Sequence, residues 1–225
     1  MGVYERVLSD LRSKSDEKFK ALSENVINGE KSLIGVRSDD IKKIARSISP
    51  CEEEEYLSSC KFEFYEDTLI YGLVLARKPK EEFTKIYKFY LSKADSWALI
   101  DCFVPAIKFL KKDKSDFFGE IDKNIDLSDG FSLRFYLVVL MDFYLTEDML
   151  GYVFSKCVTS DGKGYYTDMA IAWLISSAYI KFESATYDFL ARKRLSKFTH
   201  NKAIQKIVDS FRVKDKEKIK KLRIK

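Results

Sequence analysis

The chain has 225 residues, of which 46% are hydrophobic, and this content predicts a folded protein and excludes a disordered one. Its 40 lysines and arginines against 35 aspartates and glutamates give a net charge of only +5, which by itself indicates no nucleic-acid partner. The N-terminal residues lack the apolar run of a secretory signal, and the other apolar runs are too short and too often interrupted by charge to span a membrane. We therefore expect a cytoplasmic protein.

Cysteine and histidine are too few and too scattered for several classes of site. Cys51, Cys60, Cys102 and Cys157 form no CxxC pair, and His200 is the single histidine. A structural zinc site, a disulfide framework and a Ser/His/Asp triad therefore lack their residues. We expect no metal and no other cofactor, so any catalysis must depend on carboxylates, lysines or tyrosines.

Charge is distributed unevenly along the chain. Acidic residues gather in CEEEEYLSSCKFEFYED, and basic residues gather after residue 191, up to and within the C-terminal stretch KDKEKIKKLRIK. Such runs form either the solvated face of a helix or a binding surface, and the sequence leaves both interpretations open.

Helical patterns dominate the chain. In GVRSDDIKKIARSISP we expect Ser38 to cap a helix that carries acids in its first turn and apolar residues at helical spacing, and that ends at Ser49-Pro50. Similar spacing predicts helices at about residues 65–77, 80–93, 97–110, 130–144, 147–157, 166–181, 185–194 and 199–212. No alternating strand pattern competes with them, so the expected fold class is all-α.

Three of the expected helices, at 97–110, 130–144 and 166–181, are more apolar than their neighbours, and successive ones begin roughly three dozen residues apart. Buried helices that alternate with amphipathic ones predict stacked helix pairs, an α-solenoid of HEAT type curved around a concave groove. We expect a single repeat domain over residues 1–213, followed by a basic C-terminal tail at 214–225.

Each of these apolar helices contains a residue that is unusual in its setting. Asp101 interrupts DSWALIDCFVPAIKFL one helical turn after Trp97, Arg134 interrupts FSLRFYLVVLMDF, and Trp173 lies in DMAIAWLISSAYIKF. An unpaired charge in apolar surroundings is costly, so Asp101 should either pair with Arg134 in a core or face a wet groove. Both interpretations account for the pattern.

Five segments carry a resemblance to a known family: SLIGVRSDDIKKIAR, SWALIDCFVPAIKFL, LRFYLVVLMDFYL, YYTDMAIAWLISSAYIKF and THNKAIQKIVDSFRV. In this order they resemble the AlkD-like DNA alkylation repair family of HEAT-repeat DNA glycosylases, over about residues 3–213. The resemblance implies a monomer that holds duplex DNA in a basic concave groove. It also implies excision of cationic alkylated purines, such as 3-methyladenine and 7-methylguanine.

The resemblance also implies roles for single residues. Trp97, Asp101, Arg134 and Trp173 fall on the family's active-site positions. There the carboxylate stabilises an oxocarbenium-like deoxyribose and positions the attacking water, the tryptophans pack on the sugar, and the arginine holds a backbone phosphate. Contacts with DNA are expected from Arg37, Ser38, Lys42, Arg134, Lys202 and Lys206. Because an alkylated purine is already cationic, one fixed anion can supply most of the catalysis.

Three features depart from the family pattern. Pro105 removes the amide that would bond the carbonyl of Asp101, and Asp168 adds negative charge where related chains often have a basic or amide residue. The stretch SDEKFKALSENVINGEKS resembles a shorter branch of the family, whose members can lack the substrate-recognition helix and the glycosylase activity. Two alternatives therefore stay open: a non-catalytic HEAT-repeat protein that binds distorted or branched DNA, and a protein-binding solenoid.

Overall fold

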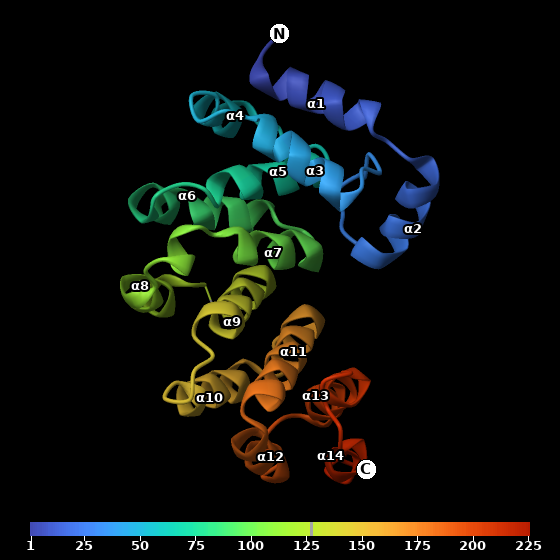
Figure 1. The fold of residues 1–225 in the computed structure, drawn as a ribbon, viewed down its shortest axis with the longest axis vertical. Coiled ribbons are helices and arrows are strands. Elements are labelled where there is room, and N and C mark those ends of the chain that lie inside the picture. Colours follow the sequence, from blue (N-terminus) through green and yellow to red (C-terminus); the bar gives the residue numbers. More distant parts are fainter. Residues whose placement is uncertain (127) are drawn as a thin grey trace. The chain divides into compact units, whose positions relative to one another are not determined.

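The computed structural model describes the backbone of residues 1–126 and 128–225, with all of their side chains except those of Ser115 and Asp116. These described residues form fourteen α-helices and two short 3-10 helices, and no β-strand (Figure 1). One isolated bridge joins Ser32 to Phe64. The predicted all-α fold class is confirmed.

The chain divides into two compact units, Met1–Phe118 and Gly119–Lys225. Since each repeat of a solenoid contacts only its neighbours, compact units also arise within one continuous repeat domain. The single domain over 1–213 therefore stays a prediction.

The first unit is built around a buried helix. It contains α1 (Val3–Ser13), α2 (Glu17–Ile27), α3 (Ser38–Ser47), α4 (Glu53–Ser59), α5 (Tyr65–Leu75), α6 (Lys80–Lys93), α7 (Trp97–Phe103), η1 (Val104–Ala106), η2 (Phe109–Lys111) and the start of α8 (Ser115–Asn124). Helix α5 packs against α3, α4, α6 and α7. Its sequence is apolar nearly all round, and every residue except Leu73 is buried.

A glycine allows α5 and α6 to approach closely. A Cβ atom on Gly72 would lie 2.7 Å from the ring of Tyr90, which is fully buried and stacks on Tyr71. The position therefore requires glycine for steric reasons.

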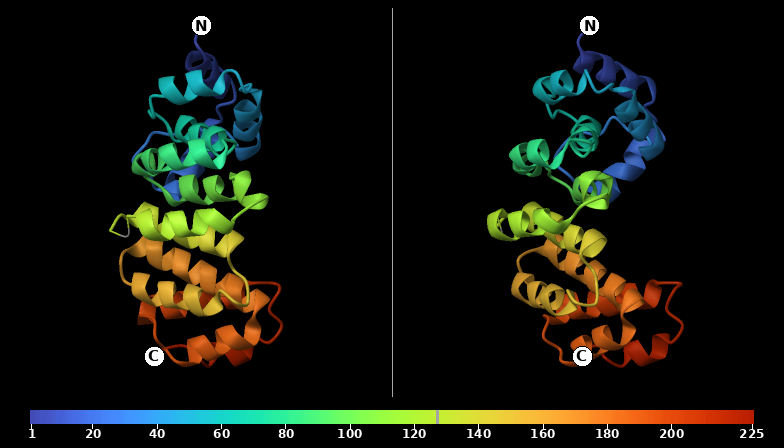
Figure 2. Two further views of the ribbon diagram at one scale, coloured as in Figure 1. Left: turned by 90° about the vertical axis from the view of Figure 1, so that its left-hand side faces the viewer. Right: turned by 60° about the vertical axis from the view of Figure 1, so that its left-hand side comes forward.

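The second unit has a row of three helices with others packed on it. It contains the end of α8, α9 (Gly130–Phe143), α10 (Leu150–Ser160), α11 (Tyr165–Lys181), α12 (Glu183–Ala191), α13 (Lys197–Asp209) and α14 (Lys216–Lys220). Helix α11 lies between α9 and α13, α10 packs on α9 and α11, α12 packs on α11, and α14 packs on α13 (Figure 2). All residues of α9 from Ser132 to Met141 are buried, which explains the apolar sequence of this helix.

Two of the sequence predictions about helix ends are wrong. The cap position of α3 is Arg37, whose side chain makes no capping hydrogen bond, and Ser38 is already the first helical residue. Helix α7 ends at Phe103 and does not extend to residue 110, because Pro105 cannot donate to the carbonyl of Asp101. Pro105 instead lies in η1, and beyond it the amide of Lys108 donates to the carbonyl of Ala76 at 2.9 Å.

The residues expected to form a basic tail are folded against α13 in the second unit. Ile219 of α14 is fully buried, the carbonyl of Leu222 lies 2.9 Å from Nε2 of His200, and Asn201 hydrogen-bonds both backbone groups of Ile224. Five helices were not predicted at all: α1, α2, α4, α8 and α14.

Candidate nucleic-acid interface

Trp97 and Asp101 lie one turn apart on α7, as their spacing predicts, and both are half-buried. The start of this helix is fixed to the segment after α2. The carboxylate of Asp95 accepts the backbone amides of Glu30 and Lys31 at 2.9 and 2.7 Å, and the indole of Trp97 donates to the carbonyl of Val26 at 3.1 Å. Trp97 therefore helps to hold α2 against α7.

A basic hollow of about 610 Å³ lies in the first unit, and Cys102, the residue after Asp101, is part of its lining. Its described lining includes no acid and contains five cationic side chains: Lys42, Arg46, Arg77, Lys108 and Lys111. The cations come from α3, the turn after α5, and the segment around η1 and η2. Such a concentration of positive charge in a concavity attracts an anion such as a phosphate.

Cys102 links Asp101 to this hollow. Its side chain lines the hollow, where desolvation raises the pKa of the thiol, and the neighbouring Asp101 carboxylate raises that pKa further. The Lys42 ammonium acts in the opposite direction and lowers it. The lining of the hollow includes Cys102, directly after Asp101 in the chain, and Pro105, four residues after Asp101.

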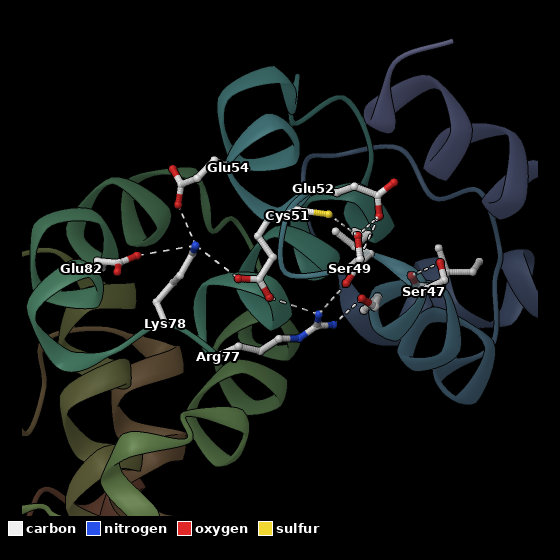
Figure 3. Close-up of polar contacts among 12 residues, drawn as sticks. Ser47, Ser49, Cys51, Glu52, Glu54, Arg77, Lys78 and Glu82 are labelled. Atoms are coloured by element: carbon white, nitrogen blue, oxygen red, sulfur yellow. Dashed lines mark hydrogen bonds and ion pairs between the residues drawn. The ribbon is translucent and has the colours of Figure 1, made fainter.

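Arg77 is positioned at the hollow by the end of α3. Its guanidinium donates to the carbonyls of Ala45 and Ile48, the latter at 3.1 Å, and lies 3.5 Å from the carboxylate of Glu53 (Figure 3). A cation at the C terminus of a helix is favourable because the carbonyls there carry partial negative charge. Arg77 is also part of the lining of the hollow.

Acidic residues of the run CEEEEYLSSCKFEFYED form ion pairs within this unit. Lys78, which is buried, holds its Nζ at 3.2 Å from Glu53, 2.7 Å from Glu54 and 3.6 Å from Glu82 (Figure 3). Arg6 pairs with Glu52 at 2.7 Å. Of the five cations of the hollow, only Arg77 is paired with one of these acids, Glu53, so the hollow keeps an excess of positive charge.

The other predicted DNA contacts of the first unit are exposed but already have weak partners. Arg37 lies 2.8 Å from Asp16 and over the ring of Phe19, and Lys42 lies 3.8 Å from Asp39. Ser38 is exposed at the start of α3. Since exposed ion pairs contribute little free energy, these partners do not prevent contact with a phosphate.

The predicted residues of the second unit occupy different settings. Arg134 is buried and donates from Nη1 to the carbonyl of Tyr166 at 2.7 Å. Trp173 is half-buried and lines a shallow hollow of about 220 Å³ with Asp142, Lys181 and Arg212 among its neighbours. Lys202 is exposed and Lys206 is half-buried on α13.

The predicted active site is thus divided between the two units: Trp97 and Asp101 belong to the first, and Arg134 and Trp173 to the second. Their convergence stays a prediction. Asp168, noted as a departure, is buried at the start of α11 and accepts the amide of Gly162 at 2.9 Å, while burial raises its pKa. The carboxylate of Asp168 therefore stabilises the loop before α11.

Most cations of the hollow were not predicted as binding residues from the sequence, although their spacing gave some indication. Arg46 lies one turn after the predicted DNA contact Lys42 on α3, and Lys111, at the end of η2, follows Lys108 by three residues. Their convergence depends on the packing of segments that are distant in the chain, which no local pattern reveals.

Within the described part of the chain, no helix has both the length and the apolar character needed to cross a membrane. The same residues contain no cluster of three or more histidine, cysteine or acidic side chains suited to a metal ion. Comparison of the chain with protein-family models, curated proteins and solved structures found no match.

Proposed function

We propose that this protein binds duplex DNA through its basic hollow and excises cationic alkylated purines, with Asp101 as the catalytic carboxylate. The observation that carries the proposal is a hollow lined by five cations and by Cys102, the residue directly after the half-buried Asp101, which itself lies one turn from Trp97 on α7. In this proposal, helices α3, α5 and α7 and helices α9, α11 and α13 belong to consecutive parts of one curved solenoid. The proposed reaction is the one that members of the resembled family catalyse.

The binding step follows from charge. Arg46, Lys108 and Lys111 are exposed and make no ion pair within the described residues. Each lysine or arginine that neutralises a phosphate releases counterions, so binding weakens steeply as salt rises and depends little on base sequence.

The chemical step requires little from the protein. The leaving purine is already cationic, and breaking its glycosidic bond leaves positive charge on the deoxyribose. A fixed carboxylate beside that sugar stabilises the developing cation and can orient the water that attacks it. Asp101 supplies the anion and Trp97 a flat surface against the sugar, and no metal or Schiff base is needed.

The binding step is tested with a double variant and a matched control. Lys108→Gln with Lys111→Gln removes two charges from the hollow, and Lys85→Gln with Lys88→Gln removes two exposed charges from α6. We expect the hollow variant to reduce the slope of log affinity against log salt by about 2, and the control to leave it unchanged. Equal slopes for both variants would reject the hollow as the phosphate site.

The catalytic step is tested by Asp101→Asn, with Asp10→Asn as a control at another half-buried aspartate. Methylated duplex DNA is incubated with each protein, and the released 7-methylguanine is measured by chromatography. We expect release by Asp101→Asn to fall about 100-fold or more, with unchanged thermal unfolding. No release by the well-folded wild type would reject the glycosylase, whereas equal release by wild type and Asp101→Asn would reject Asp101 as its catalytic carboxylate.

One observation favours a second candidate, a non-catalytic protein that binds distorted or branched DNA. Arg134, which the resemblance assigns to a backbone phosphate, is buried and bound to the carbonyl of Tyr166. A protein of this kind needs the basic hollow but no phosphate clamp at Arg134. It predicts salt-dependent binding of duplex DNA, tighter binding of branched DNA, and no base release by the wild type.

A further inference from the structure

Four aromatic side chains form a row across the N-terminal ends of α9, α11 and α13 in the second unit. Phe131 of α9 stacks on Tyr166 of α11 with ring centroids 5.7 Å apart, Tyr166 meets Tyr165 at 5.4 Å, and Tyr165 meets Phe198 of α13 at 6.0 Å. We call Phe131, Tyr166, Tyr165 and Phe198 the aromatic row. None of its four residues lines the basic hollow or belongs to the predicted active site, although Arg134 of that predicted site bonds the carbonyl of Tyr166.

The outer half of the row is open to solvent. Tyr165 is 60% exposed and Phe198 is 42% exposed, whereas Phe131 and Tyr166 are half-buried. Large aromatic side chains are normally covered, and two exposed rings in contact with each other are a common feature of binding surfaces. The apolar side of α13 is already used elsewhere, because Ala203, Ile204 and Ile207 are fully buried.

The row is held in place by polar contacts behind it. Arg134 bonds the carbonyl of Tyr166 and thereby fixes the start of α11 to α9. The carboxylate of Asp161 accepts from the amide and hydroxyl of Ser196 and from the hydroxyl of Thr199, which ties the loop before α11 to the start of α13. The exposed rings therefore stand on a rigid base, and a ligand that stacks on them need not order them first.

Positive charge borders the open end of the row. Lys163 precedes Tyr165 in the loop, Lys197 precedes Phe198, and Lys202 holds its Nζ 5.7 Å from the Phe198 ring centroid. All three are exposed, and none makes an ion pair within the described residues. A ligand for this surface should therefore carry both flat rings and negative charge.

We infer that the aromatic row is a stacking site for unpaired bases of single-stranded nucleic acid, with Lys163, Lys197 and Lys202 bound to the adjoining phosphates. Unpaired bases stack on exposed aromatic rings with little sequence preference, and a cationic border binds the backbone. The bases of an intact duplex are covered by their neighbours and cannot stack in this way. This site goes beyond the proposed binding of duplex DNA and does not depend on it.

The test compares strands that differ only in their bases. Fluorescence anisotropy measures the affinity of the full chain for a dye-labelled oligothymidylate of about 12 nucleotides, and for an abasic strand of equal length and charge. We expect Tyr165→Ala and Phe198→Ala each to weaken oligothymidylate binding about tenfold, and to leave abasic binding unchanged. Tyr165→Phe, which keeps the ring, should bind like the wild type.

Phe211→Ala is the matched control, because Phe211 is fully exposed in the same unit but makes no ring contact within the described residues. It should bind like the wild type, and oligouridylate in place of oligothymidylate shows whether RNA is also accepted. Equal wild-type affinity for the abasic strand, or equal losses in Phe211→Ala and Tyr165→Ala, would overturn the inference. Binding to anionic phosphatidylserine vesicles but not to oligonucleotides would also overturn it, in favour of a membrane surface. Duplex binding and base release are measured in parallel, so that failure of the proposed function can be distinguished from failure of this inference.

Discussion

Arg134 and Tyr166 are joined by a hydrogen bond of 2.7 Å from the guanidinium Nη1 to the backbone carbonyl, and this bond connects two helices of the second unit, α9 and α11. An arginine that interrupts an apolar helix thus has a structural partner in the chain itself. Its burial means that the cost of desolvating the guanidinium is offset by hydrogen bonds, as a buried charge requires.

We expect Arg134→Met to lower the free energy of unfolding by about 2 kcal/mol in the absence of DNA, because a hydrogen bond from a charged group is lost. Arg134→Lys should recover part of the loss. Urea unfolding followed by circular dichroism measures both. An Arg134→Met variant as stable as the wild type, but with a shallower salt dependence of duplex binding, would assign Arg134 to phosphate contact instead.

Glu66 is expected to be essential for the first unit. Its buried carboxylate accepts the backbone amides of Ile34, Gly35 and Val36 at 2.9, 2.7 and 3.1 Å, and so orders the segment before α3. Glu66→Gln replaces one acceptor oxygen with a donor, which should lower the free energy of unfolding by about 2–3 kcal/mol. Glu81→Gln, at the corresponding exposed position of α6, serves as the control and should have almost no effect in the same denaturation assay.

Asp122 should make the protein sensitive to acid. Burial disfavours its charge, but hydrogen bonds from Lys156, Tyr152 and Tyr136 outweigh burial and lower its pKa to about 2. Because the folded-state pKa lies below the unfolded value of 3.8, the stabilisation is complete above the unfolded value and is lost as pH falls toward 2.

The corresponding experiment compares the free energy of unfolding of the wild type and Asp122→Asn between pH 6 and pH 2. The wild type should be more stable by about 2 kcal/mol at pH 6, and the difference should shrink as the pH falls. A difference that stays constant over this range would show that the carboxylate charge does not stabilise the network.

His200 should make the second unit sensitive to mildly acidic pH. It is fully buried, its Nε2 contacts the carbonyl of Leu222, and burial lowers its pKa below the ordinary value of 6.5. The unfolded chain therefore binds a proton more readily than the folded one, so stability is greatest above pH 6.5 and declines as the pH falls below it. In His200→Gln, unfolding followed between pH 8 and pH 5 should lack this decline, whereas an equal decline in both proteins would point to other groups.

Local periodicity accounts for what the sequence predicted well. The apolar patterns of α9 and α11 required buried helices, and the four-residue spacing of Trp97 and Asp101 put both on one face of α7. These features depend on contacts within about one helical turn, and such contacts can be inferred from residues that are close together in the sequence. The early end of α7 was also foreshadowed, since Pro105 lacks the amide that the helix needs.

Tertiary packing decided the features that depend on distant partners. In the sequence, Glu66 is one acid in an acidic run, and only the fold shows that it accepts three backbone amides from about 30 residues earlier. The C-terminal stretch is basic in sequence, and only the fold shows that Ile219 and Leu222 pack against α13. The basic hollow and the aromatic row arise in the same way, from residues on helices that only folding brings together. A side chain's chemistry is fixed by its residue type, but its partner is fixed by which remote segment packs beside it, because hydrogen bonds and ion pairs act over a few ångströms and not along the chain.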